Sequence, residues 1–187
     1  MKFLLYSLAG GLVMLFAVIG VGVHGGSFLL SDLAKVDFSG AIGKELFVGF
    51  FIAFAIKAPM VPVHTWLPDT AEQATAGASS LLVGLLDKIG TFGMLRLCLG
   101  LFPAASDWAT PFVLTLAIIS VLWGAMMAAT SSDLMRFVSY TSVSHFGFMV
   151  IGIFALTTTS ITGSIFYMFN HGFSTAALFL VLGFLVR

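Results

Sequence analysis

Long apolar segments follow one another along the whole chain, and most charged side chains lie in the connections between them. A helix needs about 20 predominantly apolar residues to cross the hydrocarbon core of a bilayer. Six segments reach that length. The pattern therefore predicts an all-α protein, a polytopic membrane helix bundle with about six transmembrane helices. The predicted helices are 3–23, 45–67, 77–100, 110–130, 134–156 and 161–186.

The connections between these segments indicate one bundle. The longest, 24–44, is polar and glycine-containing, so it is expected in water or at the membrane surface. The others, among them 103–109, are short, which favours consecutive antiparallel helices. No composition shift divides the chain, so residues 1–187 are predicted to form a single membrane domain.

Composition supports lipid as the solvent of this protein. The chain is 59% hydrophobic and 9% charged, with a mean hydropathy of +1.11, whereas a soluble domain carries about 25% charged residues. The net charge is zero, so nothing points to nucleic acid as a partner. The single cysteine, Cys98, excludes an internal disulfide.

Two prolines interrupt the second predicted helix. Pro59 and Pro62 each remove a backbone donor and clash with the preceding turn. Irregular backbone at membrane depth is stable only where protein buries it or where it lines a wet cavity. We therefore predict a broken helix just after Lys57, with the carbonyls of residues 55–58 free to bind water or a cation. The alternative is a proline kink that serves packing alone.

Two lysines, Lys57 and Lys88, lie inside apolar segments. A lysine at the centre of a membrane helix costs roughly 2.5–3.5 kcal/mol on insertion scales, and such residues commonly mark ion or proton paths. A structural cation paired with an acid is the alternative. Asp87 precedes Lys88 but points about 100° away around a helix. It is therefore expected to neutralise a lysine on an adjacent helix.

Two histidines, His145 and His171, lie near the middle of the last two predicted helices. Histidine titrates near neutral pH and has two ring nitrogens, which suits proton relay. With the two lysines, these residues predict a lateral chain of four proton-transferring groups from four helices. For each histidine, the alternative is a hydrogen bond to a serine or threonine of a neighbouring helix.

Several other residues are secondary candidates. His64 lies beside Trp66 and is expected at the membrane edge, where aromatic residues gather. Asp69 and Glu72 are expected near the start of the third helix, where the helix dipole favours anions. Small residues of the third helix are expected to allow close helix packing. These residues are Gly84, Gly90 and Gly93.

Four stretches carry a resemblance to a known family: KAPMVPVHTWLPD, LLVGLLDKIGTFGMLR, RFVSYTSVSHFGF and FNHGFSTAALF. The chain resembles the antiporter-like membrane subunits of respiratory complex I, and among them the M type. The resemblance covers nearly the whole chain. It implies a fragment that spans roughly the sixth to eleventh helices of a longer antiporter-like subunit, built from inverted five-helix repeats with a broken helix in each.

The resemblance also implies residue roles. Lys57 matches the family's central lysine on the broken helix, and Lys88 matches its connecting lysine. His145 and His171 match histidines of its hydrophilic axis. The glutamate that pairs with the central lysine lies outside the resembled region. Asp87 departs from the family pattern, which has a neutral residue at that position.

The function implied by the resemblance is proton translocation within NADH–quinone oxidoreductase, in the bacterial inner membrane. Partners would be other membrane subunits, the lipid bilayer and protons. This chain is expected to bind no redox cofactor; NADH, FMN, iron–sulfur clusters and quinone are expected on other subunits. Three alternatives stay open: a cation/proton antiporter subunit of the same family, a structural subunit without a working path, and a hydrogenase-linked or ferredoxin-driven relative.

Overall fold

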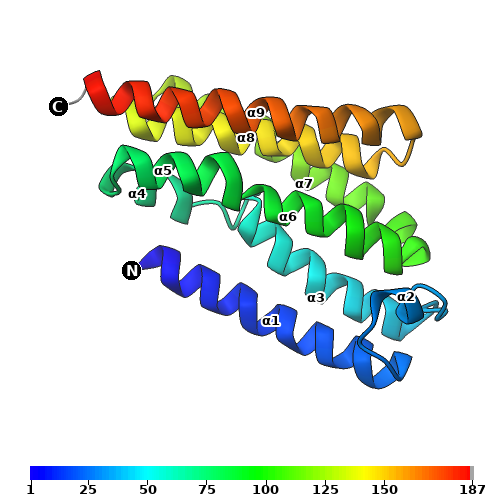
Figure 1. Ribbon diagram of the computed structural model, residues 1–187. Helices are drawn as coiled ribbons and strands as arrows, with labels where there is room; N and C mark the ends of the chain where they lie inside the picture. The colour runs from blue at the N-terminus through cyan, green and yellow to red at the C-terminus, as the bar shows by residue number, and fades with distance from the viewer. Residues whose placement is uncertain (186–187) are drawn as a thin grey trace.

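The computed structural model describes residues 1–185, and they form a bundle of helices without strands (Figure 1). The all-α prediction is therefore confirmed; residue 186, the last of the sixth predicted helix, lies outside the described part. The helices are α1 Lys2–Gly25, α2 Leu30–Leu33, α3 Ala41–Lys57, α4 Trp66–Gln73, α5 Ala76–Leu81, the π-helical η1 Leu82–Leu86, α6 Lys88–Gly93, the π-helical η2 Met94–Leu99, α7 Pro103–Ala129, α8 Leu134–Phe154 and α9 Thr158–Leu185.

The long helices lie side by side and alternate in direction, so that α1 begins and α9 ends at the same end of the bundle (Figure 1). The central helix is α8, which packs against both α7 and α9. In its most apolar stretch 61% of the residues are buried, against 17% in α1. The segment α5–η2 lies between α3 and α9 and contacts both.

Within residues 1–185, four helices are long and apolar enough to cross a membrane, judged by length and composition: α1, α7, α8 and α9. The second predicted span is shorter as a helix, because α3 ends at Lys57 and not at residue 67. The third predicted span is helical from residue 76 to 99 but contains two π-helical segments, which the sequence pattern did not predict.

One predicted connection is wrong. Residues 103–109 form the first two turns of α7, which begins at Pro103. Proline is well tolerated at the first position of a helix, because the N–H that it lacks would have no intrahelical partner there. The apolar stretch 110–130 therefore starts about two turns inside α7.

The outer surface of the bundle is apolar. Four phenylalanines on it are between 74% and 79% exposed: Phe16, Phe166, Phe173 and Phe184. An exposed apolar surface of this extent is typical of a membrane or interaction face and not of a soluble monomer. It agrees with the hydropathy of the chain.

Gly90 brings α6 against the broken end of α3. A Cβ atom on Gly90 would lie 2.6 Å from the backbone N of Ala58 and 2.8 Å from the carbonyl O of Phe54. A Cβ on Gly84 would lie 2.9 Å from Ala176 Cβ on α9. The predicted use of these glycines for close packing is therefore confirmed at both positions.

Candidate proton-transfer site

The break in the second helix is a compact, hydrogen-bonded segment. Helix α3 ends at Lys57 and α4 begins at Trp66, so Pro59 and Pro62 lie between two helices. Met60 N donates to Ala55 O at 3.1 Å, and Trp66 Nε1 donates to Ile56 O at 2.9 Å. The prediction that these carbonyls are free is therefore wrong for Ala55 and Ile56, because the chain turns back after the break and supplies its own donors.

The segment between α3 and α4 is also tied to α7. Val61 N donates to Ser120 Oγ at 2.9 Å. Ala58 and Met60 are 0% and 1% exposed. Protein therefore buries the centre of the irregular backbone, as a non-helical segment at membrane depth requires. No sequence pattern singles out Ser120, since a lone serine inside an apolar helix has many ordinary uses.

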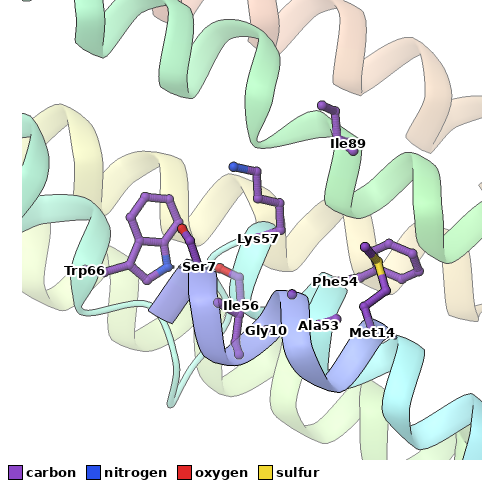
Figure 2. Close-up of a pocket in the computed structure, with 10 residues that line it drawn as sticks. Ser7, Gly10, Met14, Ala53, Phe54, Ile56, Lys57, Trp66 and Ile89 are labelled. Atoms are coloured by element: carbon purple, nitrogen blue, oxygen red, sulfur yellow. Dashed lines mark hydrogen bonds between the residues drawn. The ribbon is translucent and has the colours of Figure 1, made fainter. Parts of the chain in front are cut away.

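Lys57 lies at the last position of α3 and lines a cavity of about 230 Å³ between α1, α3 and α6. Figure 2 shows its side chain pointing away from the axis of α3, toward the segment where η1 passes into α6. Its Nζ lies 5.8 Å from the centroid of the Phe3 ring. Within residues 1–185 no carboxylate lies within ion-pair distance of Lys57, so the acid that would pair with it directly is not in this part of the chain.

Lys88 follows the π-helical turn η1 and reaches back across it. Its Nζ donates to the carbonyl O of Val83 at 2.5 Å and lies 2.9 Å from Nδ1 of His171 on α9. Wider π-helical turns occur often at functional sites. The two contacts hold the ammonium group between α6 and α9.

His145 on α8 extends this contact to a third helix. Its ring centroid lies 5.1 Å from that of His171, and its Nδ1 is hydrogen-bonded to the hydroxyl of Tyr167. Sequence reasoning missed Tyr167. The signal was available, because Tyr167 precedes His171 by four residues and so shares its helix face.

Asp87 lies just before Lys88 and is 0% exposed. Neither carboxylate oxygen has a hydrogen-bond partner among the described residues. The cations whose charges act on it are Lys57 and Lys88. Burial of an unpaired carboxylate is unfavourable, so a group placed in this way is a candidate for function and not an ordinary packing residue.

The secondary candidates lie elsewhere. His64 is 5% exposed, so it is inside the bundle, with its ring 6.4 Å from that of Tyr140. Asp69 and Glu72 do not cap the third helix. The side chain of Thr75 accepts from Ala78 N there, because Thr75 directly precedes the first turn.

Asp69 and Glu72 form a charged cluster with α1 and α8 instead. Asp69 accepts from Lys2 Nζ at 2.5 Å and from Arg136 Nη1 at 2.9 Å, and Glu72 accepts from Arg136 Nη1 at 2.7 Å. The hydrogen bond from Lys2, helped by Arg136 and opposed by partial burial, holds the pKa of Asp69 below its ordinary value of 3.8. The cluster joins three helices at one end of the bundle.

The structure brings three of the four predicted proton-transferring side chains into contact. Lys88, His171 and His145 form a continuous row across α6, α9 and α8. Lys57 lies apart from this row, on the other side of α6. Among residues 1–185, no cluster of three or more metal-ligating side chains is found.

The family model "NADH:quinone oxidoreductase/Mrp antiporter, TM" matches residues 1–187. The chain belongs to this family. The resemblance seen in the four sequence stretches is thereby confirmed, and the chain is a multi-pass membrane protein.

Individual relatives and solved structures support the same family assignment. NADH-quinone oxidoreductase subunit M of Mycobacterium tuberculosis (strain H37Rv) is 50% identical over 196 residues, covering 99% of this chain and 35% of that protein. A chain of respiratory complex I from Thermus thermophilus superposes with a TM-score of 0.92 at 34% identity, covering 98% of this chain and 40% of that one. A chain of the Mrp complex from Dietzia sp. DQ12-45-1b gives 0.88 at 26% identity, covering 97% and 20%. This chain spans about a third of the length of the M subunits that it matches.

Proposed function

We propose that this chain is part of a proton-translocating M-type membrane subunit of NADH–quinone oxidoreductase. In this proposal Lys57, Lys88, His171 and His145 carry protons laterally between helices. The observation that carries it is the contact of Lys88 Nζ with His171 Nδ1 at 2.9 Å, with His145 next in the row. The 50% identity to a protein named as subunit M supports the choice of complex.

The chemistry suits proton transfer. A lysine in a low-dielectric site has its charged form disfavoured, so that small changes in nearby charge move its proton. A neutral histidine can accept a proton at one ring nitrogen and release the proton that the other nitrogen carries. The ring is therefore charged only between these two events. Electron transfer on other subunits would supply the changes in charge.

The proposal includes a membrane topology. The divided segments α3 and α5–η2 cross the bilayer as do α1, α7, α8 and α9, which gives six crossings in one membrane domain of a longer subunit. The broken helix is stable at membrane depth because its centre is buried. NADH, FMN, iron–sulfur clusters and quinone belong to other subunits, and the membrane is the bacterial inner membrane.

A second candidate function is a cation/proton antiporter subunit. The family name and the TM-score of 0.88 with a chain of an Mrp complex favour it. The lower identity to that chain, 26% against 50% for subunit M, ranks it second. Sodium-dependent flux in vesicles without NADH would support the antiporter in place of the NADH-driven pump.

The test is Lys57→Ala in the full-length parent subunit, in inverted membrane vesicles, with NADH oxidation and proton uptake read together. We expect proton uptake per NADH to fall at least fivefold while the complex still assembles. Lys35→Ala is the matched control, because that side chain is 79% exposed on the connection between α1 and α3. Proton uptake unchanged in Lys57→Ala would reject the proposal and favour a structural role.

A further inference from the structure

Asp87 is the most completely buried charged side chain near the proposed path, at 0% exposure. Both of its oxygens lack a hydrogen-bond partner in the part of the chain that the structure describes. A carboxylate in such a place is stable only if a cation or water compensates it or if it binds a proton. The charged groups around Asp87 therefore determine whether it is ionised or binds a proton.

Asp87 lies in the segment that meets the broken end of α3. Gly90, three residues later, packs so closely against α3 that a Cβ atom on it would lie 2.6 Å from the backbone N of Ala58 and 2.8 Å from the carbonyl O of Phe54. Lys57 is the residue before Ala58, and Figure 2 shows its side chain directed toward this part of η1 and α6. Lys88, on the other side, is bound to Val83 and His171.

Asp87 lies in the chain between the two lysines, at the point where the row of contacting groups is interrupted. Lys88, His171 and His145 are in contact, but Lys57 reaches none of them directly. The positive charges that act on the Asp87 carboxyl group are those of Lys57 on α3 and of Lys88 on the same segment as Asp87. No other ionisable side chain of residues 1–185 acts on it in this way.

We propose that Asp87 is a proton-carrying group between Lys57 and Lys88, an additional member of the path. This inference rests on the proposed function, since it requires that protons move between the two lysines. It adds to the proposed path a carboxyl group that the proposed function does not include.

The transfer balances in two steps. The Lys57 ammonium gives a proton to the Asp87 carboxylate, which leaves a neutral amine and a carboxylic acid. The carboxylic acid then gives the proton to neutral Lys88, which restores the carboxylate and forms an ammonium. In the first step an ammonium and a carboxylate become a neutral amine and a neutral acid, so the net charge of the buried site stays constant.

The alternative is a permanent counter-ion that never binds a proton. The two roles differ in one observable, because a permanent counter-ion stays ionised throughout turnover. A carrier becomes a carboxylic acid for part of the cycle, and its C=O stretch then appears in an infrared difference spectrum.

The experiment uses the assembled complex with Asp87→Asn and Asp87→Glu in the full-length parent. We expect Asp87→Asn to lower proton uptake per NADH at least fivefold and Asp87→Glu to retain at least half. The matched control is Asp32→Asn, on the exposed connection, which should behave as the parent. Infrared difference spectra of the parent during NADH turnover should contain a carboxylic acid band that Asp87→Glu shifts and Asp87→Asn removes.

Each result decides the inference. Parent-like pumping in Asp87→Asn, with pumping lost in Lys57→Ala, would overturn the role of Asp87 and leave the proposed function intact. Parent-like pumping in Lys57→Ala would reject the proposed function itself. If Asp87→Asn fails to assemble, the infrared spectra of the parent and of Asp87→Glu still decide between the two roles. If neither spectrum contains a carboxylic acid band that appears during turnover and that Asp87→Glu shifts, Asp87 is a permanent counter-ion.

Discussion

The Nζ atom of Lys88 lies 2.9 Å from Nδ1 of His171, and this contact joins α6 to α9. An ammonium group is a donor only, so the lysine donates and the histidine accepts. The ring proton of neutral His171 is therefore on Nε2. That atom is buried and has no protein partner among residues 1–185. His171 thus has one nitrogen bound to the lysine and the other available to release a proton.

Replacing this histidine should interrupt the path. We expect His171→Leu to lower proton uptake per NADH at least tenfold in inverted vesicles of the assembled complex, because Lys88 then has no ring nitrogen to donate to. General acid–base groups commonly contribute about 10²–10⁴ in rate, so a tenfold loss is a low expectation. The control is Phe173→Leu, two residues along α9 and 77% exposed. Full pumping in His171→Leu would show that protons leave Lys88 by another route.

The close approach of α6 to α3 predicts a stability effect at Gly90. A methyl group there would meet the backbone of Ala58 and Phe54, which cannot rotate away. We expect Gly90→Ala to destabilise the subunit by about 1–3 kcal/mol, the usual range for overpacking. Thermal unfolding of the detergent-purified complex would measure it.

Gly163→Ala is the matched control for that substitution. Gly163 lies within α9, and a Cβ there would have no neighbour within 4 Å. Because alanine favours a helix over glycine by about 1 kcal/mol, this variant should be as stable as the parent or more so. Equal loss in both variants would contradict the packing argument.

The charged cluster around Asp69 predicts a pH dependence. Lys2 and Arg136 hold the pKa of Asp69 in the folded state below its ordinary value of 3.8. A lowered folded-state pKa means that the carboxylate stabilises the fold above the unfolded pKa, and that this contribution is lost as pH falls through the folded pKa. Asp69→Asn should therefore lower the unfolding temperature at pH 6. The difference from the parent should shrink as the pH falls below about 3.8, and it should vanish only below the lowered folded-state pKa. The cluster is partly exposed, so the effect should be small and should shrink in high salt. A difference that persists at low pH would mean that Asp69 acts by packing.

The sequence predicted most of the long helices and the break after α3, but not the π-helical segments η1 and η2. Apolar length alone predicted α1, α8 and α9 nearly to their ends, because in lipid every backbone group must be bonded within its own helix. Two prolines predicted the end of α3 near Lys57. The same reasoning placed the start of α7 too late, since apolar length says nothing of polar residues that continue a helix beyond the membrane.

Only the tertiary structure decided which candidate residues meet. Lys88 and His171 are 83 residues apart in the chain, and their contact depends on how α5 and η1 pack against α9. Gly84 lets η1 approach α9 closely, whereas Gly90 lets α6 approach the broken end of α3. The π-helical turn η1 also changes the rotation of Asp87 and Lys88 around the helix. A sequence pattern records which side chains a helix carries. It does not contain the rotation and register of two packed helices, because these follow from the shapes of both surfaces together.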